Sequence, residues 1–225
     1  MILALAATEL EMKPFIAEAK ARSLSCRTLV TGVGPVETTL RLTRFLCESN
    51  EQFDAVCLFG IGGAYVQPDQ RCQAALLDIC LAEKEVSGDF GICFGDVMEY
   101  LDSSLVGEVV YQMDESLRNR CRTVFDRLEI EHRRGVFITV NGITGNAIRG
   151  EMLRARWNGL CENMEGAAVA RVCCDFILPC AEIRCISNYV EDRDPRTWRL
   201  QEACMKSAHT AVQLIEAMTI PHGKL

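Results

Sequence analysis

Side chains that can take part in chemistry follow several apolar segments of this chain. Glu11 stands just after the apolar run ILALAAT, Glu165 stands in the segment ENMEGAAVA, and Ser187 and Asn188 follow the run RCI. A carboxylate can accept a proton from a nucleophile or hydrogen bonds from sugar hydroxyls. A carboxamide offers one acceptor and one donor on adjacent atoms. These residue types favour a site for a small polar ligand.

Each of these residues also has a purely structural explanation. Glu11 and Glu165 could stand in the first turn of a helix, where a carboxylate is favourable, and Asn188 could cap a turn. The glycines of TGVGP and FGIGGAY could make tight turns with positive φ. Polar or glycine-rich breaks recur at so many strand ends, however, that a ligand site is favoured. The same breaks also contain Asn163, Met164, Ile61, Gly62, Ile143 and Thr144.

The composition limits the partners of the protein. Of its 225 residues 49% are hydrophobic and 24% are charged, and the formal net charge is −7. A negative protein is a poor partner for nucleic acid or for an anionic membrane. No apolar run approaches the roughly 20 residues of a membrane span, and the N-terminus lacks the basic segment of a signal peptide. We therefore expect a cytoplasmic protein that binds a small molecule, and neither nucleic acid nor a membrane.

The cysteines and histidines do not form a recognisable metal site. The 13 cysteines are odd in number, never stand at C-x-x-C spacing and fall mostly inside apolar runs. Such cysteines behave as small buried hydrophobes in a reducing cytoplasm. His132, His209 and His222 are far apart and match no metal-ligand spacing. We therefore expect no metal.

Short apolar runs alternate with helical patterns along the whole chain. We expect strands at residues 2–8, 27–31, 54–60, 74–82, 135–141 and 181–187. We expect helices at residues 9–22, after the GVG segment, at 114–129, at 164–176 and at about 198–218. This alternation predicts an α/β fold, a single three-layer α/β/α domain over residues 1–225 with a mixed, mostly parallel central sheet. In such a sheet ligands bind beyond the carboxyl ends of the strands, where the polar residues stand.

Five segments resemble the nucleoside phosphorylase and nucleosidase superfamily in sequence and spacing. They are TELEMKPF, TGVGPVETTL, FGIGGAY, ENMEGAAVA and RCISNYVEDRD. The resemblance is strongest to the branch with the methylthioadenosine/S-adenosylhomocysteine nucleosidases and the futalosine hydrolases, and ISNxVEDRD followed by Trp198 is similar to the latter. It implies hydrolysis of a purine nucleoside through a ribosyl cation, with water as co-substrate and no cofactor. It also implies a homodimer or a higher homo-oligomer, in which a neighbouring subunit completes the pocket for the 5′ group.

The resemblance also assigns roles to single residues. Glu11 matches the carboxylate that positions and deprotonates the attacking water. Glu165 matches the acceptor of the ribose 2′- and 3′-hydroxyls, with Met164 packed on the sugar. The GITG segment, with Ile143 and Thr144, resembles the loop that faces the base. Further substrate contacts are expected from Asn163, Ile61, Gly62 and Ser187.

Asn188 stands where the resemblance places an aspartic acid in the adenine-specific members. Its NH2 group can donate to O6 of a 6-oxopurine while its carbonyl accepts from N7–H. With adenine, one orientation would oppose two NH2 groups, a mismatch that discriminates by up to about 10⁴-fold. We therefore expect futalosine as the substrate, with hypoxanthine and dehypoxanthine futalosine as products, in menaquinone biosynthesis by the futalosine route.

Three alternatives stay open. The first is an adenine nucleosidase acting on methylthioadenosine, S-adenosylhomocysteine or aminodeoxyfutalosine. The second is a phosphorylase, disfavoured because no arginine cluster stands at the strand ends and Glu11 would repel phosphate. The third is a nucleoside-binding module without turnover. Arg193 and Arg196 could bind a benzoate-bearing 5′ chain or pair with neighbouring acids at the surface, and Trp198 is expected to pack in the core or against a helix.

Overall fold

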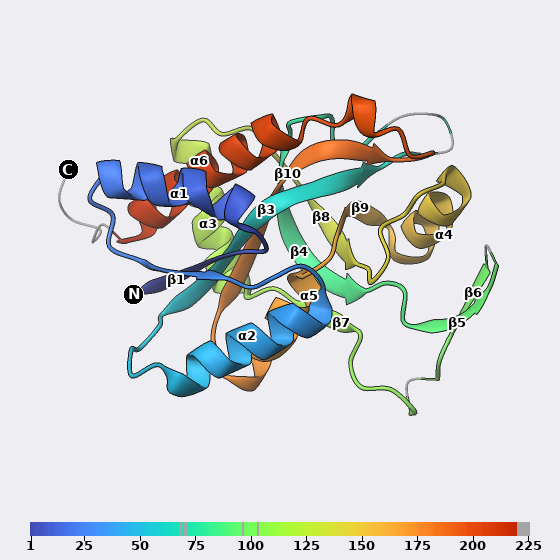
Figure 1. The fold of residues 1–225 in the computed structure, drawn as a ribbon, viewed down its shortest axis with the longest axis horizontal. Coiled ribbons are helices and arrows are strands. Elements are labelled where there is room, and N and C mark those ends of the chain that lie inside the picture. The colour runs from blue at the N-terminus through green and yellow to red at the C-terminus, as the bar shows by residue number, and fades with distance from the viewer. Residues whose placement is uncertain (68, 70–71, 96, 103, 220–225) are drawn as a thin grey trace.

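A mixed β-sheet runs through the centre of the molecule, with helices on both of its faces (Figure 1). The structure is a computed structural model that describes residues 1–67, 69, 72–95, 97–102 and 104–219. Within those residues the sheet has eight strands in the order β10-β4-β8-β9-β3-β1-β2, with β7 paired to β4. A separate hairpin consists of β5 and β6. The strands are β1 (Ile2–Ala6), β2 (Arg27–Val30), β3 (Ala55–Tyr65), β4 (Ile79–Ser87), β5 (Gly91–Phe94), β6 (Val97–Tyr100), β7 (Val110–Gln112), β8 (His132–Thr139), β9 (Gly159–Asn163) and β10 (Cys180–Val190).

The strand pairing is mostly parallel. β1 pairs in parallel with β2 and β3, β3 with β10, and β8 with β4 and β9. The pairs β10–β4, β3–β9 and β4–β7 are antiparallel. Near the end of β3, Gly63 pairs with Glu162 of β9 on one side and with Asn188 of β10 on the other. This double pairing brings three strands that are distant in sequence to one point.

Two groups of helices cover opposite faces of the sheet, and α4 (Ala147–Trp157) lies apart from both groups, beside β8 and β9 (Figure 1). The other helices are α1 (Glu9–Ala21), α2 (Pro35–Glu48), α3 (Glu115–Arg127), α5 (Gly166–Asp175) and α6 (Leu200–Thr219), and a 3₁₀ turn spans Pro195–Thr197. α1, α3 and α6 enclose one apolar core with the sheet, in which the rings of Phe15 and Phe59 stack. α2 and α5 enclose a second core that contains Leu42 and Val169.

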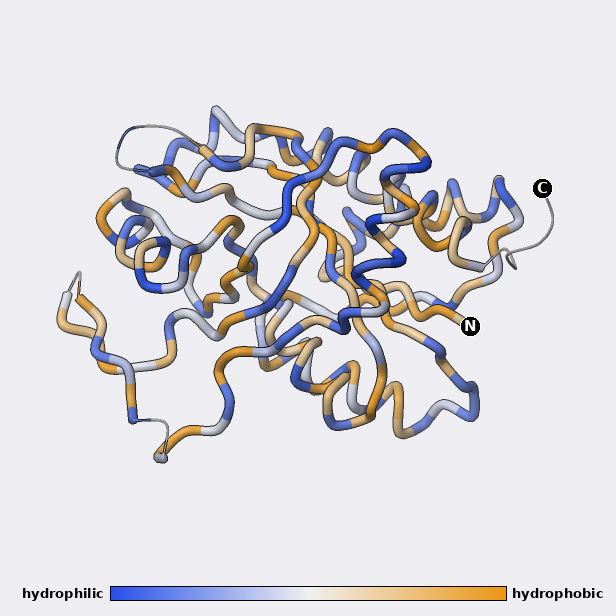
Figure 2. Tube along the Cα trace, turned by 180° about the vertical axis from the view of Figure 1, so that it is seen from behind, coloured by the Kyte–Doolittle hydropathy of each residue, from blue (hydrophilic) through white to orange (hydrophobic). Residues whose placement is uncertain are grey.

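The hydropathy of the chain follows this layering, because the strands of the sheet are largely hydrophobic and the helices mix hydrophobic and hydrophilic residues (Figure 2). The predicted α/β fold with a mixed, mostly parallel sheet is confirmed. None of the helices formed by the described residues has the length and apolar character that crossing a membrane requires.

The strand predicted at residues 74–82 is wrong in its first half, since β4 runs from Ile79 to Ser87. Leu77 has a positive φ of 67°, and the Asp78 carboxylate accepts a hydrogen bond from the backbone N–H of Ala75 at 3.0 Å. An aspartate that binds backbone two or three residues away favours a turn, which here outweighs the apolar composition. α4, β7, β9 and the β5–β6 hairpin were not predicted, because their short segments lack clear periodicity.

Two predicted strand ends also lie elsewhere. β3 continues through the IGG segment, and only the GVG segment makes a turn, with φ of 82° at Gly32 and 88° at Gly34. β10 likewise extends past Ser187, so Asn188 lies within this strand and not after it. Both strands are prolonged because they pair with each other up to Tyr65 and Val190.

Candidate active site

A cavity of about 240 Å³ lies where β3, β9 and β10 meet. The segments after β1 and β8 and the starts of α5 and α6 complete its wall. The ten site residues predicted from the sequence all line it: Glu11, Asn188, Glu165, Met164, Asn163, Ile61, Gly62, Ile143, Thr144 and Ser187. The fold therefore brings the whole predicted set together, and the chemical roles of its members stay predictions.

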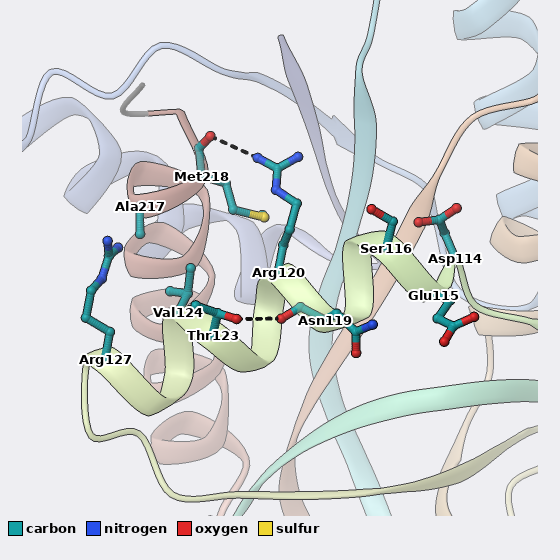
Figure 3. A pocket seen from close by; sticks show the side chains of 10 residues that line it. All are labelled: Asp114, Glu115, Ser116, Asn119, Arg120, Thr123, Val124, Arg127, Ala217 and Met218. Atoms are coloured by element: carbon teal, nitrogen blue, oxygen red, sulfur yellow. Dashed lines mark hydrogen bonds between the residues drawn. The ribbon is translucent and has the colours of Figure 1, made fainter. Parts of the chain in front are cut away.

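A larger hollow of about 670 Å³ lies between α3 and the end of α6 (Figure 3). Two of its polar side chains bond to backbone carbonyls of these helices: Arg120 donates to the Met218 carbonyl at 3.3 Å and Thr123 to the Asn119 carbonyl at 3.0 Å. Most of its lining comes from the exposed side of one helix, and it contains none of the predicted site residues. The smaller cavity is therefore the candidate active site.

Glu11 is held rigidly at the start of α1. Thr8 and Glu11 form a capping box: Thr8 Oγ1 accepts from the Glu11 N–H, and Glu11 Oε2 accepts from the Thr8 N–H at 3.0 Å. The Thr8 hydroxyl donates to the same oxygen at 2.7 Å, while Glu11 Oε1 accepts from the Ile61 N–H at 3.1 Å. A Cβ at Gly60 would lie 2.6 Å from Glu11 Oε1, so glycine is required there. The sequence thus builds a buried carboxylate of fixed orientation, only 4% exposed.

Glu165 is the N-cap residue of α5, yet its own side chain does not cap the helix. Asn163 Oδ1 accepts from the N–H groups of Glu165 and Gly166 at 2.9 and 2.8 Å and so does the capping. This arrangement leaves the Glu165 carboxylate at the cavity, where it accepts from the Gly34 N–H at 3.2 Å and from Arg184 at 3.2 Å. Burial raises the pKa of Glu165, while the charge of Arg184 opposes the rise.

Arg184 is a buried cation behind the cavity wall. Its Nε donates to Glu182 at 2.7 Å, Nη1 to the Ile61 carbonyl at 3.1 Å, and Nη2 to Glu165 at 3.2 Å and Asn163 at 3.4 Å. Burial works against its charge, but the carboxylates of Glu182, Glu165 and Glu11 raise the pKa of Arg184 above its usual value. Arg184 therefore stays charged and links the sheet to the carboxylate that faces the cavity.

The loop after β8 is anchored from two sides. Glu162 accepts from the Thr144 N–H at 2.9 Å, from the Thr144 hydroxyl at 2.6 Å and from the Tyr65 hydroxyl at 3.0 Å. Burial raises the pKa of Glu162 and these hydrogen bonds counteract the rise. Asp89 accepts from the Asn141 N–H at 2.8 Å. Because both ends of the loop are held, the residues that line the cavity between them have a defined position.

Asn188 and Ser187 are adjacent in sequence and both line the cavity. The strand register shifts between Ile186 and Asn188, a bulge that breaks the normal alternation of side chains. Asn188 Oδ1 accepts from the Ser187 hydroxyl at 2.8 Å, and Asn188 Nδ2 donates to the Tyr189 carbonyl at 3.1 Å. These two bonds fix which end of the amide is nitrogen and leave one N–H and one lone pair for a ligand.

The segment after β10 partly corrects the sequence interpretation. Trp198 is not a core residue, because it is half-buried and lines the cavity. The Arg193 guanidinium stacks over the Trp198 ring, 4.4 Å from its centroid. Arg196 pairs with Asp194 at 2.7 Å at the surface, as the alternative explanation predicted. Trp198 and Arg193 are therefore the members of this segment that are close enough to affect the mouth of the cavity.

Sequence reasoning missed four buried charged residues around the site, namely Arg184, Glu182, Glu162 and Glu85. Glu182 and Arg184 stand two residues apart in a run that is otherwise apolar, which places both on one side of β10. Two oppositely charged residues at alternate positions of an apolar strand predict an internal ion pair. Glu85 and Glu162 carry no comparable signal, because their partners come from other segments.

Cys204 is the cysteine that lines the cavity among the described residues, and none of the histidines that the structure describes lines it. All 13 cysteines are free thiols, most of them buried. His132 lies near the Ile130 carbonyl and His209 pairs with Glu18, while His222 falls outside the described residues. No group of three or more potential metal ligands was found among the side chains that the structure describes.

Known proteins with a similar sequence or fold are enzymes of nucleoside metabolism by name. Futalosine hydrolase of Thermus thermophilus is 29% identical over 196 residues, which cover 83% of this chain and 80% of that protein. Aminodeoxyfutalosine nucleosidase of Helicobacter pylori is 24% identical over 187 residues, covering 83% and 76%. The native structure of futalosine hydrolase from Helicobacter pylori matches with a TM-score of 0.81 at 19% identity, covering 96% of this chain and 97% of the other.

The match to a protein family extends over nearly the whole fold. The family described as the Phosphorylase superfamily matches residues 12–219, a range that includes every cavity residue predicted from the sequence except Glu11. The resemblance found in the five sequence segments is confirmed at this level. Family match, sheet topology and the convergence of strand ends on one cavity agree, and this chain belongs to the Phosphorylase superfamily.

Proposed function

We propose that the protein is a nucleosidase that hydrolyses the N-glycosidic bond of a purine nucleoside, with futalosine as substrate and hypoxanthine as the released base. The observation that carries the proposal is the convergence of Glu11, Glu165 and Asn188 on one cavity. One carboxylate can bind the attacking water, the second can bind the ribose, and the amide can bind a 6-oxopurine. The relatives named futalosine hydrolase support this choice of substrate.

Glu11 is proposed to position and deprotonate the attacking water. Thr8 donates twice to Oε2, while Oε1 accepts only from the Ile61 N–H and retains a lone pair that can accept from a water. A base whose orientation is fixed before the substrate binds loses no entropy in the reaction. The water would attack C1′ as the bond to the base breaks.

Glu165 is proposed to accept hydrogen bonds from the two ribose hydroxyls. Arg184 and the Gly34 N–H each occupy one of its oxygens from the protein side. The remaining lone pairs can receive the 2′- and 3′-hydroxyls, and Met164 can pack on the sugar. A negative charge near the sugar favours the positive charge that develops on it in the transition state.

Asn188 is proposed to select the base. The free N–H of its amide can donate to O6 of hypoxanthine, and once the departing base has taken a proton from solvent at N7, the free lone pair of Oδ1 can accept from N7–H. Ser187 supports this arrangement, because its hydroxyl donates to Oδ1 and so keeps the carbonyl end in place. Adenine would present its amino group to the amide N–H, which leaves donors facing each other.

Phosphorolysis is disfavoured by the charges around the cavity. Arg184 is the only arginine that lines it within the described part of the chain, and four of its five N–H groups are used by protein acceptors. Two buried carboxylates, Glu11 and Glu165, face the space that phosphate would need. Their negative charge would repel the anion.

The second candidate function is an adenine nucleosidase acting on aminodeoxyfutalosine. The observation in its favour is the similarity to three proteins named aminodeoxyfutalosine nucleosidase, at 24% to 27% identity. The same two carboxylates would serve that reaction. The two functions differ in the base that Asn188 meets, so the released base distinguishes them.

We also propose that the protein acts in the cytoplasm as a homodimer, with residues 1–225 as one catalytic unit. Leu10 and Val33 line the cavity and are nevertheless 54% and 52% exposed. Large apolar side chains at the rim of a site are well placed to be covered by a second subunit. Light scattering coupled to gel filtration would show a mass of twice 25.1 kDa, and a monomer at micromolar concentration would contradict the proposal.

The proposed reaction is tested by incubating the protein without phosphate with futalosine, aminodeoxyfutalosine, methylthioadenosine and inosine in separate reactions. The released base is then identified by chromatography. Hypoxanthine from futalosine is the expected result, and adenine from the amino substrates alone would favour the second function. A rate that depends on added phosphate would support phosphorolysis. The Glu11→Gln variant serves as the control for a contaminating activity.

A further inference from the structure

A group of buried ionisable side chains lies behind the cavity and contains more acids than bases. Glu85, Glu182, Glu165 and Glu11 are 0%, 1%, 3% and 4% exposed, and Arg184, at 2%, is the cation among them. Complete ionisation would leave an excess of three negative charges over the single positive charge of Arg184, in a region shielded from water. Charges in such surroundings are strongly unfavourable unless paired, and carboxyl groups avoid the cost by keeping a proton.

Glu85 and Glu182 face each other across Gly166. A Cβ on Gly166 would lie 2.0 Å from Glu85 Oε1 and 2.3 Å from Glu182 Oε2, so both oxygens occupy the space that a side chain would fill. Glu182 Oε1 accepts from Arg184 Nε at 2.7 Å. Glu182 Oε2, in contrast, is buried and has no hydrogen-bond partner of its own. A hydrogen carried by the neighbouring carboxyl group would give this oxygen a partner.

The surroundings of Glu85 indicate that Glu85, and not Glu182, carries this hydrogen. The Thr139 hydroxyl donates to its Oε2 at 2.8 Å, and Asn163 Nδ2 donates to its Oε1 at 2.5 Å. Among the described residues it forms no ion pair of its own, whereas Glu182 is paired with Arg184. Burial, and next the charge of Glu182, raise the pKa of Glu85 far above its ordinary value.

We propose that Glu85 is a neutral carboxylic acid that donates its proton to Glu182, and that this pair positions Arg184 and, through it, the ribose-binding Glu165. Glu85 is thereby a positioning residue. Its proton leaves Glu182 with a single negative charge, which matches the charge of Arg184. Arg184 then bonds to Glu182 through Nε and to Glu165 through Nη2, with no further negative charge at Glu85 to draw it away from Glu165.

The charged and titratable groups around Glu85 define what would disturb this arrangement. β10 contributes Glu182 and Arg184, β9 contributes the Cys161 thiol, and the start of α5 contributes Glu165. Deprotonation of Glu85 would set two carboxylates against each other and pull Arg184 away from Glu165. The sugar would then be held less firmly, so that KM would rise more than kcat falls.

The proton itself can be measured without substrate. We expect the infrared spectrum of the protein at pH 7 to contain the C=O band of a protonated carboxyl that shifts in D₂O and that is lost in Glu85→Gln. Glu83→Gln is the matched control, because Glu83 is on the same strand but pairs with Arg134 at the surface. A protonated-carboxyl band of undiminished intensity in Glu85→Gln would overturn the proposal.

The positioning effect is tested by kinetics and rests on the proposed function. Glu85→Gln keeps a neutral donor toward Glu182 but sets its NH2 group against the Asn163 NH2 group, which donates to Glu85 Oε1 in the wild-type protein, so we expect KM to rise less than in Glu85→Leu and kcat to stay within about twofold of the wild-type value. Glu85→Leu removes the donor, and we expect KM to rise about tenfold or more, since Glu182 Oε2 is then left unpaired. A Glu85→Gln variant as impaired as Glu85→Leu would refute the neutral acid.

Two further measurements keep the outcomes separate. Thermal unfolding of each variant shows whether Glu85→Leu folds. If it does not fold, the kinetics of Glu85→Gln and the infrared spectrum still test whether Glu85 is protonated. Absence of any base release from the wild-type protein would refute the proposed function and leave the infrared result valid. Base release without the infrared difference would refute the shared proton alone.

Discussion

Replacing Asn188 by aspartate tests how the cavity selects the base. The substitution exchanges the amide NH2 for a second carboxylate oxygen and leaves the size of the side chain unchanged. The Ser187 hydroxyl can still donate to Oδ1, as it does at 2.8 Å in the wild-type protein. The group that faces O6 of hypoxanthine, however, changes from a donor to an acceptor.

The size of the effect follows from the number of hydrogen bonds that change. Loss of the donor leaves O6 unpaired at a cost of about 1–3 kcal/mol, and a new acceptor for the adenine amino group gains a similar amount. Together these terms change the ratio of the two kcat/KM values by roughly 30-fold to 10⁴-fold. Because Asn188 is half-buried before a ligand binds, we expect the lower part of this range, about 10²-fold.

The assay compares kcat/KM for futalosine and aminodeoxyfutalosine in the wild-type protein and in Asn188→Asp, with chromatographic identification of the base. Asn146→Asp is the matched control, because Asn146 caps α4 outside the cavity and aspartate caps a helix equally well. We expect the control to leave the ratio unchanged. An Asn188→Asp variant with the wild-type ratio would refute the assignment of base selection to this amide.

Three further predictions concern the carboxylates and their glycine neighbour. Glu11→Gln should lower kcat by about 10²-fold to 10⁴-fold with little change in KM, and near-normal turnover would exclude it as the base. Gly166→Ala should destabilise the protein by about 1–3 kcal/mol in urea unfolding, because the new methyl group would overlap Glu85 and Glu182, whereas Gly145→Ala, which meets nothing within 4 Å, should not. Because the folded-state pKa of Glu85 lies above its ordinary 4.5, the stability that it contributes is complete below that pH and is lost as pH rises through the folded-state pKa. The loss is up to about 1.4 kcal/mol per pH unit, so unfolding of Glu85→Gln should depend less on pH than that of the wild-type protein, and parallel curves would contradict this.

The layers of the fold could be predicted because periodicity is a local property. Residues 9–22 repeat apolar side chains at helical spacing, and α1 occupies Glu9–Ala21. β9 could not be predicted in this way, since its five residues include Glu162 and Asn163. Both are buried only because hydroxyl and amide partners reach them from distant segments. Such partners are set by the tertiary fold, which a short sequence window does not contain.

The site was predictable to the extent that polar residues interrupt apolar runs. Glu11 and Asn188 could be singled out in this way, although Asn188 lies within β10 and not after it. The residues that hold them could not, because Arg184 lies inside a strand where apolar burial was assumed. The glycines of β3 were misinterpreted for a related reason. Gly60 gives Glu11 and Arg184 room to approach the backbone, a requirement that resembles a turn in sequence.

The bulge in β10 connects the two halves of the site. In a regular strand, alternate residues point to the same side, so Arg184 and Asn188 could face the cavity while Ser187 faced away. The register shift between Ile186 and Asn188 removes this restriction, and both Ser187 and Asn188 line the cavity. Arg184, on the regular part of the same strand, meanwhile supports Glu165. One strand therefore positions the proposed sugar contact through its regular part and the proposed base contact through its bulge, and a shift of β10 relative to β3 would disturb both contacts together.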